Sequence, residues 1–207
     1  MTSDYIDLAL ILAVDVSTSI DAGDYQLQMT GIASALRDKE FIDAIGSGPH
    51  SSIAVSVVQW STRLSQEVTL DWTIIGNSSQ AKDAAGVIES AARRWMPGGT
   101  GMAAAINFCV RHFDRLRIQS KRRVIDVSGD GEDNEDGDIN GSRDEAISRG
   151  ITINGLPIIS GSGSIQSYYD QNVIGGPGHF LVPAANVLDF QRAIKEKLLR
   201  ELKPIIA

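Results

Sequence analysis

The sequence of 207 residues has little cysteine, few aromatic side chains and no long apolar run. Its single cysteine, Cys109, rules out an internal disulfide framework and a zinc site built from cysteines. No apolar stretch approaches the roughly 20 residues that a membrane-spanning helix needs. Lys and Arg number 19 against 26 Asp and Glu, a formal net charge of −7. Because such a surface repels phosphate backbones and anionic lipid, we expect neither nucleic-acid binding nor membrane insertion.

The start of the chain lacks the pattern of a secretory signal. Its first apolar run, residues 8–14, follows Asp4 and Asp7, where a signal peptide would place lysine or arginine. Two interpretations stay open at this point: the protein remains inside the cell, or its leader is absent from this sequence.

Several catalytic signatures are also missing. Neither the Gly-x-Ser-x-Gly elbow of α/β-hydrolases nor a glycine-rich nucleotide loop occurs. A phosphatase of the haloacid-dehalogenase type would carry a carboxylate two residues after Asp15, but Ser17 stands there and cannot act as a general acid at neutral pH. The histidines His50, His112 and His179 lack the spacing of metal ligands and are expected at the surface or in loops. We therefore expect no enzyme, with metal-assisted hydrolysis as the minority alternative.

The chain alternates short apolar runs with longer periodic ones. This pattern predicts strands, most of them buried on both faces, at residues 6–14, 53–60, 66–72, 123–128, 151–159 and 180–183. Helical periodicity predicts helices at residues 24–45 with a break near Asp38, from Ser78 or Ser79 to about Trp95, and at 102–116, 142–149 and 186–202. Strands separated by helices predict an α/β fold. We expect a central, mostly parallel sheet with one antiparallel edge strand, helices on both faces, and a single domain over residues 1–207.

Oxygen-bearing side chains gather in three loops. The first strand leads into Asp15-Val16-Ser17-Thr18-Ser19, a glycine-rich loop holds Thr100, and the strand at 123–128 leads into Gly129-Asp130. Ligands of such sheets bind at the carboxyl ends of the strands, so we expect these loops to meet. Two carboxylates and three hydroxyls, without imidazole or thiolate, suit Mg²⁺, Mn²⁺ or Ca²⁺ better than zinc or copper. The predicted metal ligands are Asp15, Ser17, Ser19, Thr100 and Asp130.

These residues resemble the metal-ion-dependent adhesion site (MIDAS) of von Willebrand factor type A (vWA) domains. The family pattern is Asp-x-Ser-x-Ser after the first strand, a threonine in a mid-chain loop and an aspartate after the fourth strand. The resemblance covers essentially the whole chain, because the order of strands and helices also fits. More narrowly, GITINGLPI at 150–158 and VIGGPG at 173–178 resemble a bacterial vWA subgroup of unknown function. Gly129 departs from the pattern, since many vWA domains have threonine there.

The resemblance implies a three-layer vWA fold and a metal-dependent site for protein binding. In family members the serines and the threonine bind the ion directly, while one or both aspartates act largely through water. Neutral hydroxyls leave the ion much of its positive charge and an open position, which a partner's Glu or Asp carboxylate is expected to fill. The alternatives are a metal-dependent phosphohydrolase and a vWA scaffold whose metal only stabilises the loops.

Location and assembly follow from the same resemblance. The bacterial subgroup is commonly exported, which implies a periplasmic or secreted location. We also expect a monomer. The residues by themselves leave a cytoplasmic location open.

Simpler interpretations compete with a metal site. Ser19 or Asp21 could cap a helix, Thr100 could cap the helix that begins at residue 102, and Asp130 could start a turn. Each of the three loops is weak support on its own. All three in the expected order favour the metal site over capping.

Two further acidic features need an explanation. The stretch 130–145 is strongly acidic, and within it residues 136–141 match the first half of an EF-hand calcium loop. Arg143 and Ile147 break the second half, so we favour a solvated acidic loop over the whole stretch. Asp126 lies inside an apolar strand, where a carboxylate is costly without a hydrogen bond. We expect a backbone amide or a tryptophan as its partner, with support of the metal site as the alternative.

Overall fold

A five-stranded sheet forms the centre of the molecule, with strand order β4–β3–β2–β6–β7. The computed structural model describes residues 5–94, 98–159 and 164–203. Four strands run parallel, namely β2 (Leu8–Asp15), β3 (Ile53–Trp60), β6 (Arg123–Gly129) and β7 (Ile151–Pro157). Strand β4 (Gln66–Ile75) is antiparallel to β3 at the edge. The predicted α/β fold with one antiparallel edge strand is confirmed.

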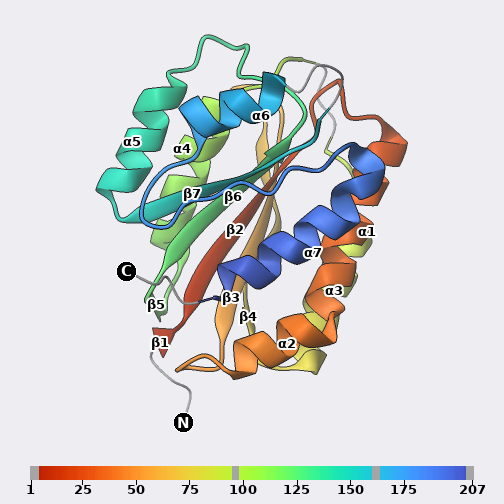
Figure 1. The fold of residues 1–207 in the computed structure, drawn as a ribbon, viewed down its shortest axis with the longest axis vertical. Helices are drawn as coiled ribbons and strands as arrows, with labels where there is room; N and C mark the ends of the chain where they lie inside the picture. Colours follow the sequence, from red (N-terminus) through yellow and green to blue (C-terminus); the bar gives the residue numbers. More distant parts are fainter. Residues whose placement is uncertain (1–4, 95–97, 160–163, 204–207) are drawn as a thin grey trace.

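Helices cover both faces of this sheet, giving three layers (Figure 1). One face is covered by α1 (Ala22–Arg37), α2 (Lys39–Gly46), α3 (Ser78–Glu89) and α7 (Phe190–Glu201). The other face is covered by α4 (Met102–His112), α5 (Ile139–Ser148) and the short α6 (Ser164–Tyr168). None of the described helices is long and apolar enough to span a membrane.

Two apolar cores lie between these layers, and β2 supplies both of them. Its even-numbered residues, from Leu8 to Val14, pack under α1 and α7, while Ala9, Ile11 and Ala13 pack under α4. This is why the strand has no polar alternation: both of its faces are buried.

Several boundaries differ from the predicted ones. The long first helix does divide at Asp38, whose carboxylate caps α2 by accepting from Glu40 N at 2.8 Å. Helix α3 is capped by Asn77 and ends at Glu89, well before Trp95, which lies outside the described residues. It ends early because the following segment turns to β3, where Arg94 N donates to Gln59 Oε1. The next predicted helix is α4, which stops at His112 and continues only as the 3-10 turn Phe113–Arg115.

The other differences lie in short elements. The predicted strand at 180–183 makes only isolated bridges to β7. The closing helix begins with the 3-10 turn Val187–Asp189 before α7. Four short elements were not predicted: the small parallel pair β1 (Tyr5–Ile6) and β5 (Gln119–Ser120), helix α6, and the π-helical turn Tyr169–Val173 (η2) that follows it.

Two polar side chains in the core have surroundings other than the predicted ones. The partner of Asp126 is neither a backbone amide nor a tryptophan but Lys197 of α7, whose Nζ lies 3.2 Å from the carboxylate. His112 is only 3% exposed, stacks on Trp72 and shares a hydrogen bond with Ser56, so the prediction of a surface histidine is wrong. In both cases the partner comes from a distant element, which local sequence does not reveal.

Candidate metal centre

The candidate site lies where the parallel strands β2 and β6 end side by side. Val14 and Ser128 are paired neighbours in the sheet, so the chain leaves both strands at the same end of the sheet. Three segments meet there. We call them the Asp15 loop (residues 15–19), the Thr100 loop (98–101) and the Asp130 loop (129–131).

A chain of hydrogen bonds joins the predicted residues of the Asp15 and Asp130 loops. Ser17 N donates to Asp15 Oδ1 at 2.7 Å, and the hydroxyls of Ser17 and Ser19 lie 3.2 Å apart. Ser19 Oγ donates to Asp130 Oδ1 at 2.7 Å. These contacts bring together four of the five side chains that the sequence singled out.

The Thr100 loop contacts both of the other loops. Thr100 is buried, and its Oγ1 would lie 3.3 Å from a β-carbon built on Gly131 of the Asp130 loop. From the Asp15 loop, Thr18 Oγ1 donates to the Gly98 carbonyl at 2.8 Å. All three predicted loops therefore converge on one point at the end of the sheet.

Helix capping does not account for these side chains. Asp21 caps α1 by accepting from Asp24 N at 2.8 Å, so Ser19 is not the cap. Gly101 is the N-cap residue of α4, and it makes no side-chain cap hydrogen bond. The hydroxyls of Ser19 and Thr100 are therefore left for another role.

The electrostatics of the site fit a cation. Asp15 is completely buried, and its Oδ2 has no hydrogen-bond partner in the described part of the chain. Burial raises the pKa of Asp15 to about 7; hydrogen bonds from Ser17 oppose the shift, and the nearby charge of Asp130 adds to it. A hard divalent cation would match the two carboxylates and three hydroxyls and compensate the cost of burying charge.

Neutral hydroxyls are essential to such a site. Across residues 5–94, 98–159 and 164–203, no group of three or more His, Cys, Asp and Glu side chains is placed to hold a metal ion. A cation bound here would therefore rely on Ser17, Ser19 and Thr100 as well as on the aspartates. The same finding argues against a calcium site in the acidic loop.

That acidic loop has a structural role that the sequence did not reveal. Asp133 Oδ2 accepts from Ala103 N at 2.7 Å, and Asn134 Oδ1 accepts from Thr100 N at 2.7 Å. Glu135 accepts from Gly99 N at 3.2 Å and from the backbone N–H of Arg63. We call residues 133–135 the bracket, because they hold the Thr100 loop and the start of α4 from the outside. The expectation of a merely solvated loop is wrong for these three residues.

The half-matched calcium motif also has an ordinary explanation. Asp138 caps α5 by accepting from Gly141 N at 2.8 Å, and the helix begins at Ile139. The aspartate and glycine spacing in this segment is therefore that of a helix start.

Arg93 supports the Asp15 loop and was not predicted. Its Nη2 donates to the carbonyls of Val16 and Ser17 at 3.3 and 3.1 Å and also to that of Ile20. One guanidinium thus fixes the backbone between the candidate ligands. The sequence offered no signal for this, because Arg93 follows α3, far from the loop along the chain.

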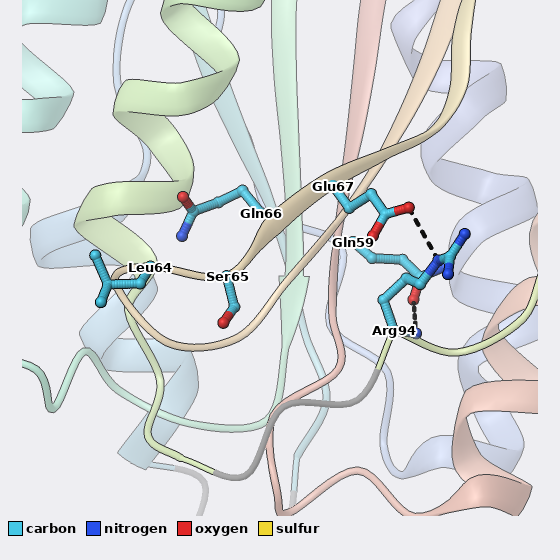
Figure 2. A pocket seen from close by; sticks show the side chains of 6 residues that line it. All are labelled: Gln59, Leu64, Ser65, Gln66, Glu67 and Arg94. Atoms are coloured by element: carbon cyan, nitrogen blue, oxygen red, sulfur yellow. Dashed lines mark hydrogen bonds and ion pairs between the residues drawn. The ribbon is translucent and has the colours of Figure 1, made fainter.

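A shallow pocket of about 200 Å³ lies beside the β3–β4 turn. Arg94 Nε lies 2.9 Å from Glu67 Oε1. Figure 2 shows this pair on one side of the pocket, while Leu64 projects from the other end of the turn. Leu64 is 85% exposed. The turn adjoins the Thr100 loop, since Gly101 N donates to Ser61 O at 2.6 Å. An exposed apolar side chain and a polar pocket therefore lie on a turn that contacts the Thr100 loop.

Comparisons with known proteins agree with this fold. The family described as "Protein of unknown function (DUF1194)" matches residues 5–206. No curated protein matches the chain.

Three solved structures illustrate the fold. Proximal thread matrix protein 1 from the mussel byssus, with a zinc-occupied MIDAS motif, has a TM-score of 0.67 and 16% identity over 99% of this chain and 49% of its own. The von Willebrand factor type A protein from Catenulispora acidiphila has a TM-score of 0.62 and 16% identity, over 95% of this chain and 43% of its own. The pilus adhesin SpaC from Lactobacillus rhamnosus GG has a TM-score of 0.69 and 14% identity, over 97% of this chain and 31% of its own. The chain thus spans about half the length of the byssus protein, and the shared feature is the vWA fold.

Proposed function

Because the chain belongs to the DUF1194 family of proteins of unknown function and has the vWA fold, we propose that it is a divalent-metal-dependent module that binds another protein. The observation that carries this proposal is the convergence of Asp15, Ser17, Ser19 and Asp130 in one hydrogen-bonded chain, with Thr100 in the adjoining loop. Relatives in fold include a mussel byssus protein with a zinc-occupied MIDAS and a pilus adhesin, which support a site of this class.

Each residue has a definite task in this proposal. Ser17, Ser19 and Thr100 contribute hydroxyl oxygens as direct ligands, while Asp15 and Asp130 contribute negative charge, largely through water. The bound ion, Mg²⁺ or alternatively Mn²⁺ or Ca²⁺, would supply the positive charge that an acidic protein needs to attract a carboxylate. The partner would present a Glu or Asp side chain to it.

The surroundings of the site can add contacts to such a partner. Leu64 is exposed at the β3–β4 turn next to the Thr100 loop, and the pocket around Arg94 and Glu67 lies on the same turn. An exposed leucine beside a polar recess provides apolar contact area and hydrogen-bonding groups, which protein interfaces combine. We infer that the partner covers this turn as well as the metal ion.

The wider setting is also part of the proposal. We infer that residues 1–207 act as one vWA domain, as a monomer, and in the periplasm or outside the cell. The adhesive proteins among the relatives in fold support an extracytoplasmic location.

The phosphohydrolase alternative is less well supported. Metal-assisted hydrolysis needs a group that activates water or protonates the leaving group. The titratable side chains in the hydrogen-bonded chain are Asp15 and Asp130, and both are assigned to the metal. Turnover of a phosphate ester in Mg²⁺ by the unsubstituted protein, lost in Asp15→Ala, would favour the alternative.

A pull-down from the source cell with and without chelator tests the proposal. We expect a partner that is retained in Mg²⁺, released by EDTA and lost with Thr100→Ala. Thr73→Ala is the matched control, because among the described residues its hydroxyl bonds only the Asp71 carbonyl on β4. If EDTA lowers the melting temperature but the partner stays bound, the metal is purely structural and the proposal is wrong.

A further inference from the structure

Two buried oxygen atoms near the candidate metal centre lack hydrogen-bond partners among the described residues. They are Asp15 Oδ2 and the hydroxyl of Tyr169, which is itself completely buried. Both atoms lie beside Gly129, on the side where a side chain would begin. A β-carbon built there would lie 2.8 Å from Asp15 Oδ2 and 3.1 Å from the Tyr169 hydroxyl. Unsatisfied buried polar atoms are costly, so two of them facing one small space call for an explanation.

Gly129 keeps this space open. The same built β-carbon would also lie 3.0 Å from Asp15 Cβ, so any larger residue would press on the aspartate. No left-handed backbone angle demands glycine at this position. The glycine is therefore explained by the room it leaves between Asp15 and Tyr169.

The fold delivers Tyr169 to this position through an irregular segment. Helix α6 ends at Tyr168 and continues as the π-helical turn η2, in which Ile174 N donates to Tyr169 O at 3.0 Å. The neighbouring Tyr168 hydroxyl accepts from Asp133 N at 3.1 Å and so contacts the bracket. Two consecutive tyrosines thus reach two different parts of the candidate site. Single π-helical turns often occur at functional sites.

We propose that Tyr169 is a positioning residue of the metal centre, which orients Asp15 through a hydrogen bond from its hydroxyl. The bond reaches Asp15 Oδ2 directly or through one water in the space beside Gly129. Ser17 N already holds Oδ1, so a second donor at Oδ2 fixes the plane of the carboxylate toward the ion. The inference rests on the proposed metal site and adds a group that the Asp-x-Ser-x-Ser pattern does not contain.

Removing the Tyr169 hydroxyl distinguishes a role in orienting Asp15 from a role in packing the core. Tyr169→Phe keeps the ring and removes only an oxygen that has no partner among the described residues. Without metal, the variant should unfold at the same or a slightly higher temperature, because an unsatisfied buried group is lost. Its affinity for metal should fall about tenfold, since removal of a residue that orients a metal ligand typically costs 10–100-fold.

Tyr25→Phe is the matched control for loss of a buried phenol hydroxyl. The Tyr25 hydroxyl is fully engaged: it donates to Ala91 O at 2.9 Å and accepts from Gln59 Nε2 at 3.0 Å. We expect this variant to lose thermal stability without metal and to keep its affinity for metal. The two tyrosines should therefore give opposite patterns.

The experiment measures Mn²⁺ binding by electron paramagnetic resonance and the melting temperature in EDTA for the unsubstituted protein and both variants. A loss of affinity of about fivefold or more in Tyr169→Phe, with an unchanged or raised melting temperature, is the expected result. A smaller loss, or a melting temperature lowered as much as in Tyr25→Phe, would overturn the inference alone. Failure of the unsubstituted protein to bind Mn²⁺ would overturn the proposed function and the inference together.

Discussion

Asp15 shows how one buried carboxylate can couple metal binding to pH. Burial raises its pKa to about 7, so in the metal-free fold this group holds its proton up to near neutrality. In the unfolded chain it would lose the proton near the ordinary value of 3.8. Between these values the folded state binds the extra proton, so this contribution to stability is largest at low pH and falls as pH rises toward 7.

Metal binding should have the opposite dependence on pH. A cation competes with the proton on Asp15, so we expect the Mg²⁺ affinity to fall by up to about tenfold for each pH unit below 7. Titration calorimetry at several values between pH 5.5 and pH 8 measures this. An affinity that does not change over the range would show that Asp15 does not exchange a proton for the ion.

Lys197 is a second residue whose burial has a measurable consequence. Its ammonium lies 3.2 Å from Asp126 and 3.6 Å from Glu201, and all three side chains are buried. Even so, burial raises the pKa of Asp126 to about 7, because desolvation exceeds the attraction of Lys197. Lys197 is therefore the cation that Asp126 relies on, while Glu201 also has Arg122 Nη2 at 3.6 Å.

Lys197→Met should lower the free energy of unfolding by about 3–5 kcal/mol, since it leaves Asp126 buried without its cation. Urea unfolding at pH 8 measures the change. The double variant Lys197→Met with Asp126→Leu should recover most of the loss, because it removes one unpaired carboxylate along with the lysine. A single variant as stable as the unsubstituted protein would contradict this account of the cluster.

At the scale of elements, the bracket of residues 133–135 positions the Thr100 loop. Asp133→Ala removes the acceptor for Ala103 N at the start of α4 and leaves the bracket without one of its anchors. We expect a loss of about 1 kcal/mol of stability, as for other lost helix caps, and a weaker affinity for metal. Thermal unfolding and Mn²⁺ titration measure the two effects.

Glu132→Ala is the control for this prediction. It removes the same charge from the same loop, but no described hydrogen bond depends on it. If Asp133→Ala and Glu132→Ala weaken metal binding equally, the loop acts through its charge and the hydrogen bonds of the bracket are unimportant.

Regular elements were predictable where their apolar pattern was continuous. Strand β3 matches its predicted range because every one of its residues is buried, and Ser56 and Gln59 interrupt the apolar run only singly. The end of α3 was missed because Gln59, on a distant strand, binds the segment that follows the helix. Helix α6 and its π-helical turn were missed because the sequence around Gly161-Ser162-Gly163 reads as a flexible loop.

In the candidate site, too, some residues could be predicted from the sequence and others could not. The side chains of the three loops could be listed from sequence because they occur in a recognisable order at strand ends. Arg93, the bracket and Tyr169 could not, because each acts on a loop that is distant along the chain. Long-range pairing leaves no periodic signal in a single sequence.

In the molecule as a whole, the topology brings the site together at the carboxyl-terminal end of the parallel strands. Parallel β2 and β6 are neighbours in the middle of the sheet, so their carboxyl ends place Asp15 and Asp130 together. The turn between the antiparallel strands β3 and β4 lies at the same end of the sheet, where its residue Ser61 contacts the Thr100 loop and Leu64 is close by along the chain. A chain of net charge −7 then presents acidic loops around a place suited to a cation.

The central claim is that the three loops bind one divalent cation with room for an outside ligand. Crystals soaked in Mn²⁺ and measured at the manganese absorption edge test it directly. The account predicts one anomalous peak within about 2.5 Å of the hydroxyl oxygens of Ser17, Ser19 and Thr100, with at least one position held by water or by a carboxylate from another molecule. Electron density with no such peak, and the three hydroxyls turned away from a common centre, would contradict it.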